Sequence, residues 1–231
     1  MKNRKLTLAL ICALAIACIG VLAGCLGPGG NANRKPDTYF AQALVQGELD
    51  LVYLGEISPE LEEAMDEDAQ ELAAYYEHAM DEAVMIFASY YDLDLSVVDQ
   101  ANIDALNRQL RETYTHVSYS VGDARQEGDV IVVPVTVAPF DVMMRMRDAF
   151  PQLSAAWRTD CANRGIDEYS VEAENMWAQY LTLALAHYTN EAGYLASSTI
   201  DVRVELDPDG YHRLNDDDYF AVDALVIYYP E

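Results

Sequence analysis

The sequence predicts an α+β fold for residues 36–231, and three observations carry this prediction. Apolar residues recur at helical spacing over most of residues 38–114. Two stretches, 117–137 and 200–214, alternate apolar and polar residues around turn-forming residues, which is typical of β-hairpins. Between them, residues 140–190 return to helical spacing. We therefore expect a single domain in which about four antiparallel strands, in two hairpins, pack against N-terminal helices and an inserted helical excursion.

Residues 1–24 have the layout of a secretory leader, with basic residues at the start and an apolar run over 6–22. The run ends in Leu22, Ala23, Gly24 and Cys25. This ending resembles the lipobox of bacterial lipoproteins, in which signal peptidase cuts before the cysteine and its sulfur carries a diacylglyceryl group. The resemblance implies that Cys25 is lipidated, with fatty acyl chains such as palmitate, and is anchored at the extracytoplasmic face of the cell membrane. Two acyl chains anchor a protein stably, whereas one binds only marginally.

The alternative for this segment is a retained transmembrane helix, because the apolar run approaches the roughly 20 residues that a span needs. The residues that follow favour cleavage, since 26–33 are rich in glycine and lack the charged or aromatic belt expected after a span. We therefore assign 1–24 to a signal peptide and 25–35 to a lipidated cysteine with a flexible tether.

Charge and cysteine content narrow the function classes. The chain has 14 basic and 39 acidic residues, and loss of the leader removes three basic ones, which leaves 11 against 39 and a formal charge of −28. Such a surface repels phosphate backbones, so nucleic acid is excluded as a partner. Cys161 is the sole cysteine left besides Cys25, so the domain depends on its hydrophobic core and not on disulfides. We expect Cys161 to be a small buried residue.

The helices before the first hairpin are predicted as follows. A short helix covers 38–44 and ends at Gly47. Ser58 caps a second helix, which begins at Pro59 and continues as one long amphipathic helix to Tyr90. Asp99 caps a third helix, whose apolar face consists of Ile103, Leu106, Leu110 and Tyr114.

The first hairpin pairs 117–121 with 130–137 around a turn at 126–129, and Pro134 indicates an edge position or a bulge. Helices then cover 140–150, which Pro151 ends, then 153–164 and 170–188. The second hairpin turns at 207–210. The C-terminus fits either a short helix over 219–227, capped by the three aspartates at 216–218, or a last strand over 219–229, and we favour the helix.

This order of elements resembles the nuclear transport factor two-like, or cystatin-like, domains of bacterial lipoproteins. Residues 40–44 and Gly47 are similar to the opening helix of that family, and 209–214 are similar to its late strand, usually written D-G-x-W-K-I. Phe220 with 224–225 is similar to its closing helix. The chain departs from the family at His212, where tryptophan is usual. The resemblance implies a cone: a curved antiparallel sheet with helices on its concave side.

Some domains of this kind hold an acid/base site for isomerase-like chemistry, which needs a carboxylate or histidine in an apolar cavity. His116 and Asp201 are the strand-borne candidates. Both lie on the polar side of an alternating strand, so we expect solvent exposure instead.

Other motifs have simpler explanations than catalysis. His78 with Glu82 and His187 with Glu191 have the spacing of two metal ligands on a helix, but a third ligand has no source, and exposed ion pairs explain them. Asp207, Asp209 and Gly210 fit a hairpin turn better than a calcium loop. Ser58 lacks the surroundings of a nucleophile. No catalytic, cofactor-binding or metal-binding residue is assigned.

Sixteen tyrosines are the remaining compositional excess. We expect most of them at the boundary of the core, with some available to a cleft or partner surface. The resulting hypothesis is a membrane-tethered, non-enzymatic binding or scaffolding module whose ligand is an unknown protein or small molecule. The alternatives are an isomerase-like enzyme and an accessory solute-binding lipoprotein. The latter is less favoured, because one domain lacks the two lobes that close around a solute.

Overall fold

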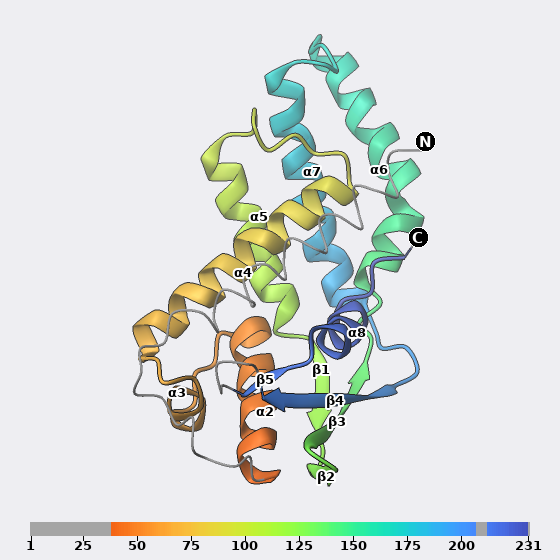
Figure 1. Ribbon diagram of the computed structural model, residues 1–231. Helices are drawn as coiled ribbons and strands as arrows, with labels where there is room; N and C mark the ends of the chain where they lie inside the picture. The colour runs from red at the N-terminus through yellow and green to blue at the C-terminus, as the bar shows by residue number, and fades with distance from the viewer. Residues whose placement is uncertain (1–37, 207–211, 231) are drawn as a thin grey trace. The chain divides into compact units, whose positions relative to one another are not determined.

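The computed structural model describes residues 38–206 and 212–230 (Figure 1). The described residues form two compact units, each assembled from separated segments of the chain. Unit 1 contains 38–79, 119–137 and 198–223, apart from 207–211, and unit 2 contains 80–118, 138–197 and 224–230. Helices and an antiparallel sheet are both present, which confirms the α+β fold class.

Unit 1 contains the sheet. Its strands are β1 (Ser118–Val121), β2 (Arg125–Glu127), β3 (Val130–Ala138), β4 (Ser198–Leu206) and β5 (His212–Leu214), in the order β1-β3-β4-β5 with β2 also paired to β3. Strands are present where both hairpins were predicted, and the turn at 207–210 lies outside the described residues. The predicted turn at 126–129 is too long, because 126 and 127 belong to β2, which pairs with the start of β3. The alternation is confirmed as well, because Val133 and Val202 are paired and buried, whereas Asp201 and Arg203 are exposed.

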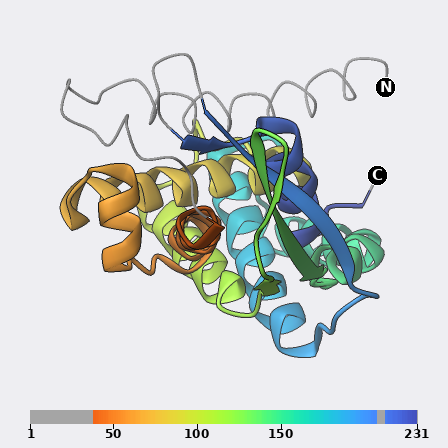
Figure 2. The ribbon, with the colours of Figure 1, turned by 60° about the horizontal axis from the view of Figure 1, so that its bottom comes forward.

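Helix α2 (Thr38–Leu54) lies against the apolar face of this sheet (Figures 1 and 2). Near its start, the ring of Phe40 meets His212 of β5 edge to face, with centroids 5.4 Å apart. Near its end, the ring of Tyr53 lies 6.0 Å from that of Tyr119 in β1. Since β1 and β5 stand at opposite ends of the strand order, α2 crosses the face of the sheet from one edge to the other.

The prediction that the first helix ends at Gly47 is wrong, because α2 continues to Leu54. Close packing against Leu61 explains why residue 47 is a glycine. A Cβ atom at position 47 would lie 2.9 Å from the Cβ of Leu61, which is closer than real contacts of this kind. Glycine therefore lets helix α3 (Pro59–Met65) approach α2 closely, and it does not end the helix.

The prediction of one long helix from Pro59 to Tyr90 is also wrong. Ser58 caps α3 as expected, since its Oγ accepts a hydrogen bond from the Leu61 amide at 3.1 Å. At Asp66 the backbone turns left-handed, with φ of 55°, and α3 ends. Helix α4 (Ala69–Tyr90) then starts at a capping box: the Asp68 carboxylate accepts from the Glu71 amide at 3.0 Å, and the Glu71 carboxylate accepts from the Asp68 amide at 3.2 Å.

Pro134 does not lie in an edge strand, because β3 pairs with β4 on one side and with β1 and β2 on the other. Its carbonyl accepts a hydrogen bond from Gly122 at 2.8 Å, one residue past the end of β1. In an antiparallel ladder the N–H and C=O of a residue point to the same neighbouring strand. The position of the missing N–H of Pro134 therefore faces the interruption between β1 and β2. No regular strand among the described residues pairs there, so few hydrogen bonds between strands are lost.

Unit 2 is helical. It contains the second half of α4, α5 (Gln100–Tyr114), α6 (Val142–Arg164) and α7 (Val171–Glu191), and α7 packs against both α5 and α6. The predicted face of α5 is confirmed at Leu106 and Leu110, which are fully buried. A buried hydrogen bond of 2.8 Å joins Thr113 of α5 to Thr189 of α7. Asp99 stands at the N-cap of α5 without a capping bond from its side chain.

The prediction that Pro151 ends a helix is wrong, because α6 continues through it to Arg164. Proline cannot donate to the carbonyl four residues earlier and crowds it. Pro151 is exposed, so water can reach the backbone group that it leaves without a helical partner.

The C-terminal segment forms the helix that we favoured, α8 (Asp216–Val226). The predicted cap is wrong, because the aspartates 216–218 lie in the first turn of the helix and the side chain of Asn215 accepts a hydrogen bond from the Asp218 amide at 3.3 Å. After α8, Ile227 forms a bridge with Phe140, and the hydroxyl of Tyr90 donates a hydrogen bond of 2.6 Å to the carbonyl of Pro230. None of the helices in 38–206 and 212–230 has the length and apolar character needed to span a bilayer.

Candidate functional site

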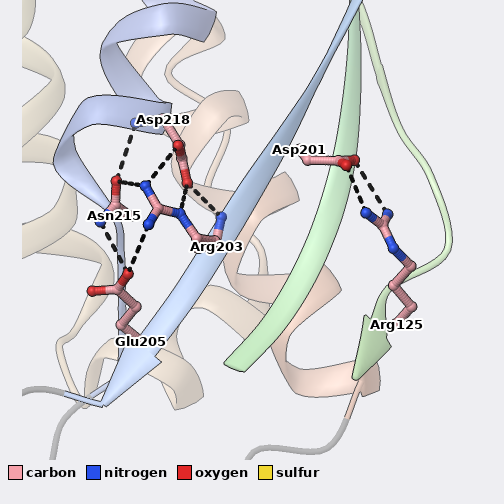
Figure 3. A network of polar contacts seen from close by, with 6 residues as sticks. All are labelled: Arg125, Asp201, Arg203, Glu205, Asn215 and Asp218. Carbon is pink, nitrogen blue, oxygen red and sulfur yellow. Dashed lines mark hydrogen bonds and ion pairs between the residues drawn. The ribbon is translucent and has the colours of Figure 1, made fainter. Parts of the chain in front are cut away.

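The lipidation site predicted at Cys25, with Leu22, Ala23 and Gly24, lies outside the described residues. The other candidates can be located. Asp201 and Arg203 belong to a network of polar contacts on the outer face of the sheet (Figure 3).

Asp201 lies on the polar outer face of the sheet, as expected (Figure 3). It is paired with Arg125 of β2 by hydrogen bonds of 2.6 and 3.2 Å, and its side chain is 54% exposed. The hydrogen bonds from Arg125 hold the pKa of Asp201 below its ordinary value. An acid/base carboxyl in an apolar cavity would show the opposite shift, so Asp201 does not fit that role.

Arg203, on the same face, ties β4 to the start of α8 (Figure 3). Its guanidinium donates to both carboxylate oxygens of Asp218, at 2.7 and 3.0 Å, and to the side-chain oxygen of Asn215 at 2.8 Å. That Asn215 oxygen also accepts from the Asp218 amide at 3.3 Å, so Asn215 caps α8. The carboxylate of Glu205 accepts from the Asn215 side chain at 3.0 Å.

The two arginines in Figure 3 thus have their donors occupied by neighbouring carboxylates and an amide. This arrangement fixes the position of β2 relative to β4 and of β4 relative to the start of α8. Both carboxylate oxygens of Asp218 already accept hydrogen bonds from Arg203. We assign these residues a structural role in unit 1.

The prediction that His116 lies in a strand is wrong, because it lies in the turn after α5 and β1 begins only at Ser118. The ring of His116 stacks on Phe140 at 5.7 Å with an interplanar angle of 7°, and its Nε2 lies 4.0 Å from the carboxylate of Glu112. The side chain is 40% exposed. His116 belongs to unit 2, whereas Asp201 belongs to unit 1.

Of the two histidine–glutamate pairs with metal-ligand spacing, His187 and Glu191 form the ion pair expected along one helix, with 3.6 Å between Nε2 and the carboxylate. Within residues 38–206 and 212–230, no group of three or more histidine, cysteine, aspartate or glutamate side chains is arranged to hold a metal ion. Cys161 is fully buried as predicted, and desolvation raises the pKa of its thiol.

Helix α2 contributes a polar cluster that the sequence analysis missed. The Asp50 carboxylate accepts hydrogen bonds from the Tyr119 hydroxyl at 2.6 Å and from the Gln46 amide at 2.7 Å. One turn on, the Tyr53 hydroxyl donates to Asp223 of α8 at 2.8 Å. Desolvation, with the hydrogen bond to Asp50 second, raises the pKa of Tyr119, so this tyrosine stays a neutral donor. The signal in the sequence was the presence of carboxylates within an otherwise apolar helix.

Glu48, two residues before Asp50, is the most perturbed carboxyl group. It is largely buried on α2, and desolvation raises its pKa from 4.5 to about 8. Its apolar neighbours along the helix include Leu44 and Leu51, both buried. A carboxyl with this pKa exchanges a proton near neutral pH, which is a property of general acids and bases.

Most tyrosines among the described residues are half-buried, as expected at the boundary of the core, for example Tyr75, Tyr90 and Tyr188. Tyr53 and Tyr91 are buried, whereas Tyr169 is almost fully exposed. Other large apolar side chains are exposed on unit 2: Met85, Val97, Val171, Leu183 and Leu195. Unit 2 therefore presents apolar and aromatic groups that its own core does not use.

The comparisons with known proteins add a structural neighbour. No protein-family model matches the chain, and no curated protein matches it. Among solved structures, the chain is similar to a Bacillus subtilis protein named "putative lipoprotein (ycdA)", with a TM-score of 0.55 and 15% sequence identity. The match covers 81% of this chain and 56% of the B. subtilis chain, so this chain spans little more than half the length of that protein. At such low identity the likeness concerns the fold.

Proposed function

We propose that this protein is a lipid-anchored lipoprotein on the extracytoplasmic face of a bacterial cell membrane, where it acts as a non-enzymatic binding or scaffolding module. The observation that carries the proposal is the sequence Leu22-Ala23-Gly24-Cys25 after an apolar leader. The name of the B. subtilis neighbour agrees with this class.

The anchor follows from the chemistry of Cys25. After cleavage before this residue, a diacylglyceryl group on its sulfur adds two acyl chains, and each buried methylene contributes about 0.8 kcal/mol. The strongly acidic domain is repelled by anionic headgroups, so the tether over 26–35 holds it off the bilayer surface.

The binding role is supported by the exposed apolar side chains of unit 2, such as Tyr169 and Leu183. Aromatic residues are enriched in protein interfaces. The finer family assignment, to nuclear transport factor two-like domains, is also part of this proposal. It is supported by α2, which crosses one face of an antiparallel sheet from edge to edge.

The test of the anchor is Cys25→Ala. We expect the variant to appear in the soluble fraction, whereas the wild type stays with the membranes. Cys18→Ala, which changes a cysteine inside the leader, is the matched control and should stay membrane-bound. Mass spectrometry of the native protein provides the decisive check, since an intact Met1 with an unmodified Cys25 would refute the anchor.

A second candidate function, an isomerase-like enzyme, is favoured by one observation, the raised pKa of Glu48. Asp201 does not offer a comparable group, because hydrogen bonds from Arg125 lower its pKa. An NMR titration of the Glu48 carboxyl tests this candidate: a pKa near 8 is required, and titration near 4.5 removes the support for an acid/base site.

A further inference from the structure

One end of unit 2 presents apolar side chains from two separate loops. Tyr169 is 96% exposed and Val171 55% exposed, both at the turn between α6 and α7. Val97, in the loop between α4 and α5, is 37% exposed. We refer to these three residues as the tip surface.

Hydrogen bonds hold the loop between α4 and α5 against the start of α7, which directly follows the turn that contains Tyr169. The amide of Asp94 donates to the Glu174 carboxylate at 2.6 Å, and the amide of Asp99 donates to the side-chain oxygen of Asn175 at 2.8 Å. Val97 lies between these two attachment points in its loop. Val171 lies one turn before Glu174 and Asn175 on α7 and therefore shares their side of the helix.

The turn that carries Tyr169 is well fixed. Ser170 caps α7 by accepting from the Ala173 amide at 3.1 Å, and its hydroxyl donates to the Asp167 carbonyl at 2.7 Å. The indole of Trp157 donates to the carbonyl of Ala173 at 3.0 Å, above a small core of Cys161, Ala173 and Met176. An exposed tyrosine on a preorganised turn binds with little loss of conformational entropy.

Carboxylates surround the tip surface. Asp94, Glu168, Glu172 and Glu174 come from the same two loops and from the first turn of α7. Arg158 lies 3.6 Å from Glu168, and Arg164 lies 3.2 Å from Asp160, so the nearby arginines are engaged with acids. The rim is therefore net acidic around an apolar centre.

We infer that the tip surface docks another protein through an apolar patch rimmed by lysine and arginine. This inference rests on the proposed function as a binding module and states which surface serves it. Charge complementarity selects the occupant, because an acidic rim repels anionic lipid and also repels a second copy of this chain. Apolar centres with polar rims are the usual anatomy of such interfaces.

The test uses three synthetic helical peptides and the full mature chain, labelled for NMR. One peptide has a leucine face and a lysine face, the second replaces lysine by glutamate, and the third replaces leucine by serine. We expect the leucine–lysine peptide to shift the amide signals of Val97, Tyr169 and Val171. The variant Tyr169→Ser/Val171→Ser should bind it about tenfold more weakly.

Tyr39→Ser, which changes a 71% exposed tyrosine of unit 1, is the matched control and should bind as the wild type does. Equal binding of the serine–lysine peptide, or equal binding by the double variant, overturns the inference. Two further outcomes would also overturn the inference. One is a dimer in sedimentation, and the other is binding to phosphatidylglycerol vesicles, if the wild type shows it and the double variant does not. Membrane fractionation of Cys25→Ala reports on the lipid anchor alone. Failure of the proposed anchor can therefore be distinguished from failure of the proposed docking at the tip surface.

Discussion

The carboxyl group of Glu48 makes the stability of the fold depend on pH. Its pKa is about 8 in the folded protein and near 4.5 when unfolded, so the folded state keeps a proton that the unfolded chain releases. Stability is therefore fully present below pH 4.5 and falls as the pH rises to 8. We expect Glu48→Gln to raise the free energy of unfolding at pH 8 by about 1–4 kcal/mol and to change it little at pH 4.5.

Urea unfolding at the two pH values measures this effect. Glu56→Gln, at an exposed position just after α2, is the matched control and should follow the wild type. A wild-type stability that does not fall between pH 5 and 8 relative to Glu48→Gln would show that Glu48 ionises normally in the folded state.

Asp141 makes stability depend on pH in the opposite direction from Glu48. Desolvation acts to raise its pKa, but hydrogen bonds from Arg145 at 2.8 and 3.0 Å and from the Gly193 amide at 2.8 Å outweigh it and lower the pKa. The stabilisation is present above the unfolded pKa and is lost as the pH falls through the folded one. We expect Asp141→Asn to cost about 1–3 kcal/mol at pH 7 and much less at pH 3, as measured by chemical denaturation. An equal cost at both pH values would contradict this.

At the scale of the elements, the contact between α2 and α3 reverses a usual rule. Alanine in place of a helical glycine normally stabilises by about 1 kcal/mol. At position 47 the added Cβ would lie 2.9 Å from Leu61, so we expect Gly47→Ala to destabilise the protein by about 1–3 kcal/mol.

A double-mutant cycle with Leu61→Ala checks the cause of this loss. If the clash is responsible, Gly47→Ala costs less, or becomes stabilising, once Leu61 is shortened. Strictly additive effects would mean that the two helices do not meet at these residues.

Elements whose signals are local in the sequence were easier to predict than those that depend on packing. The hairpin strands 118–121, 130–138, 198–206 and 212–214 and the presence of α8 follow from local patterns and were predicted correctly. The cap of α8 was not, because Asn215 takes the role predicted for the aspartates 216–218. Gly47 and Pro151 were misjudged, since their effect depends on what packs beside them or on exposure to water. The break at Asp66 was missed although its signal was local: Asp68 and Glu71 have the spacing of a capping box.

At the scale of the whole molecule, the sequence predicts a lipobox more readily than the tip surface that we propose for binding. A lipobox is a contiguous pattern, whereas the tip surface joins Val97 to Tyr169 and Val171 across more than one helix. The cluster of Asp50, Tyr119 and Asp223 likewise comes from three separate elements. Sites of this kind become visible only when the fold brings distant segments together.

The interleaving of the two units predicts how the molecule unfolds. The chain passes between them within helix α4, at 79/80, and within helix α8, at 223/224, so neither unit can unfold completely without breaking a helix of the other. We therefore expect one cooperative transition, in agreement with the single domain predicted for 36–231. Both tryptophans, Trp157 and Trp177, belong to unit 2, so their fluorescence reports on that unit alone. Hydrogen exchange of the β3 and β4 amides reports on unit 1, and urea midpoints that differ between the two measurements would show that the units unfold independently.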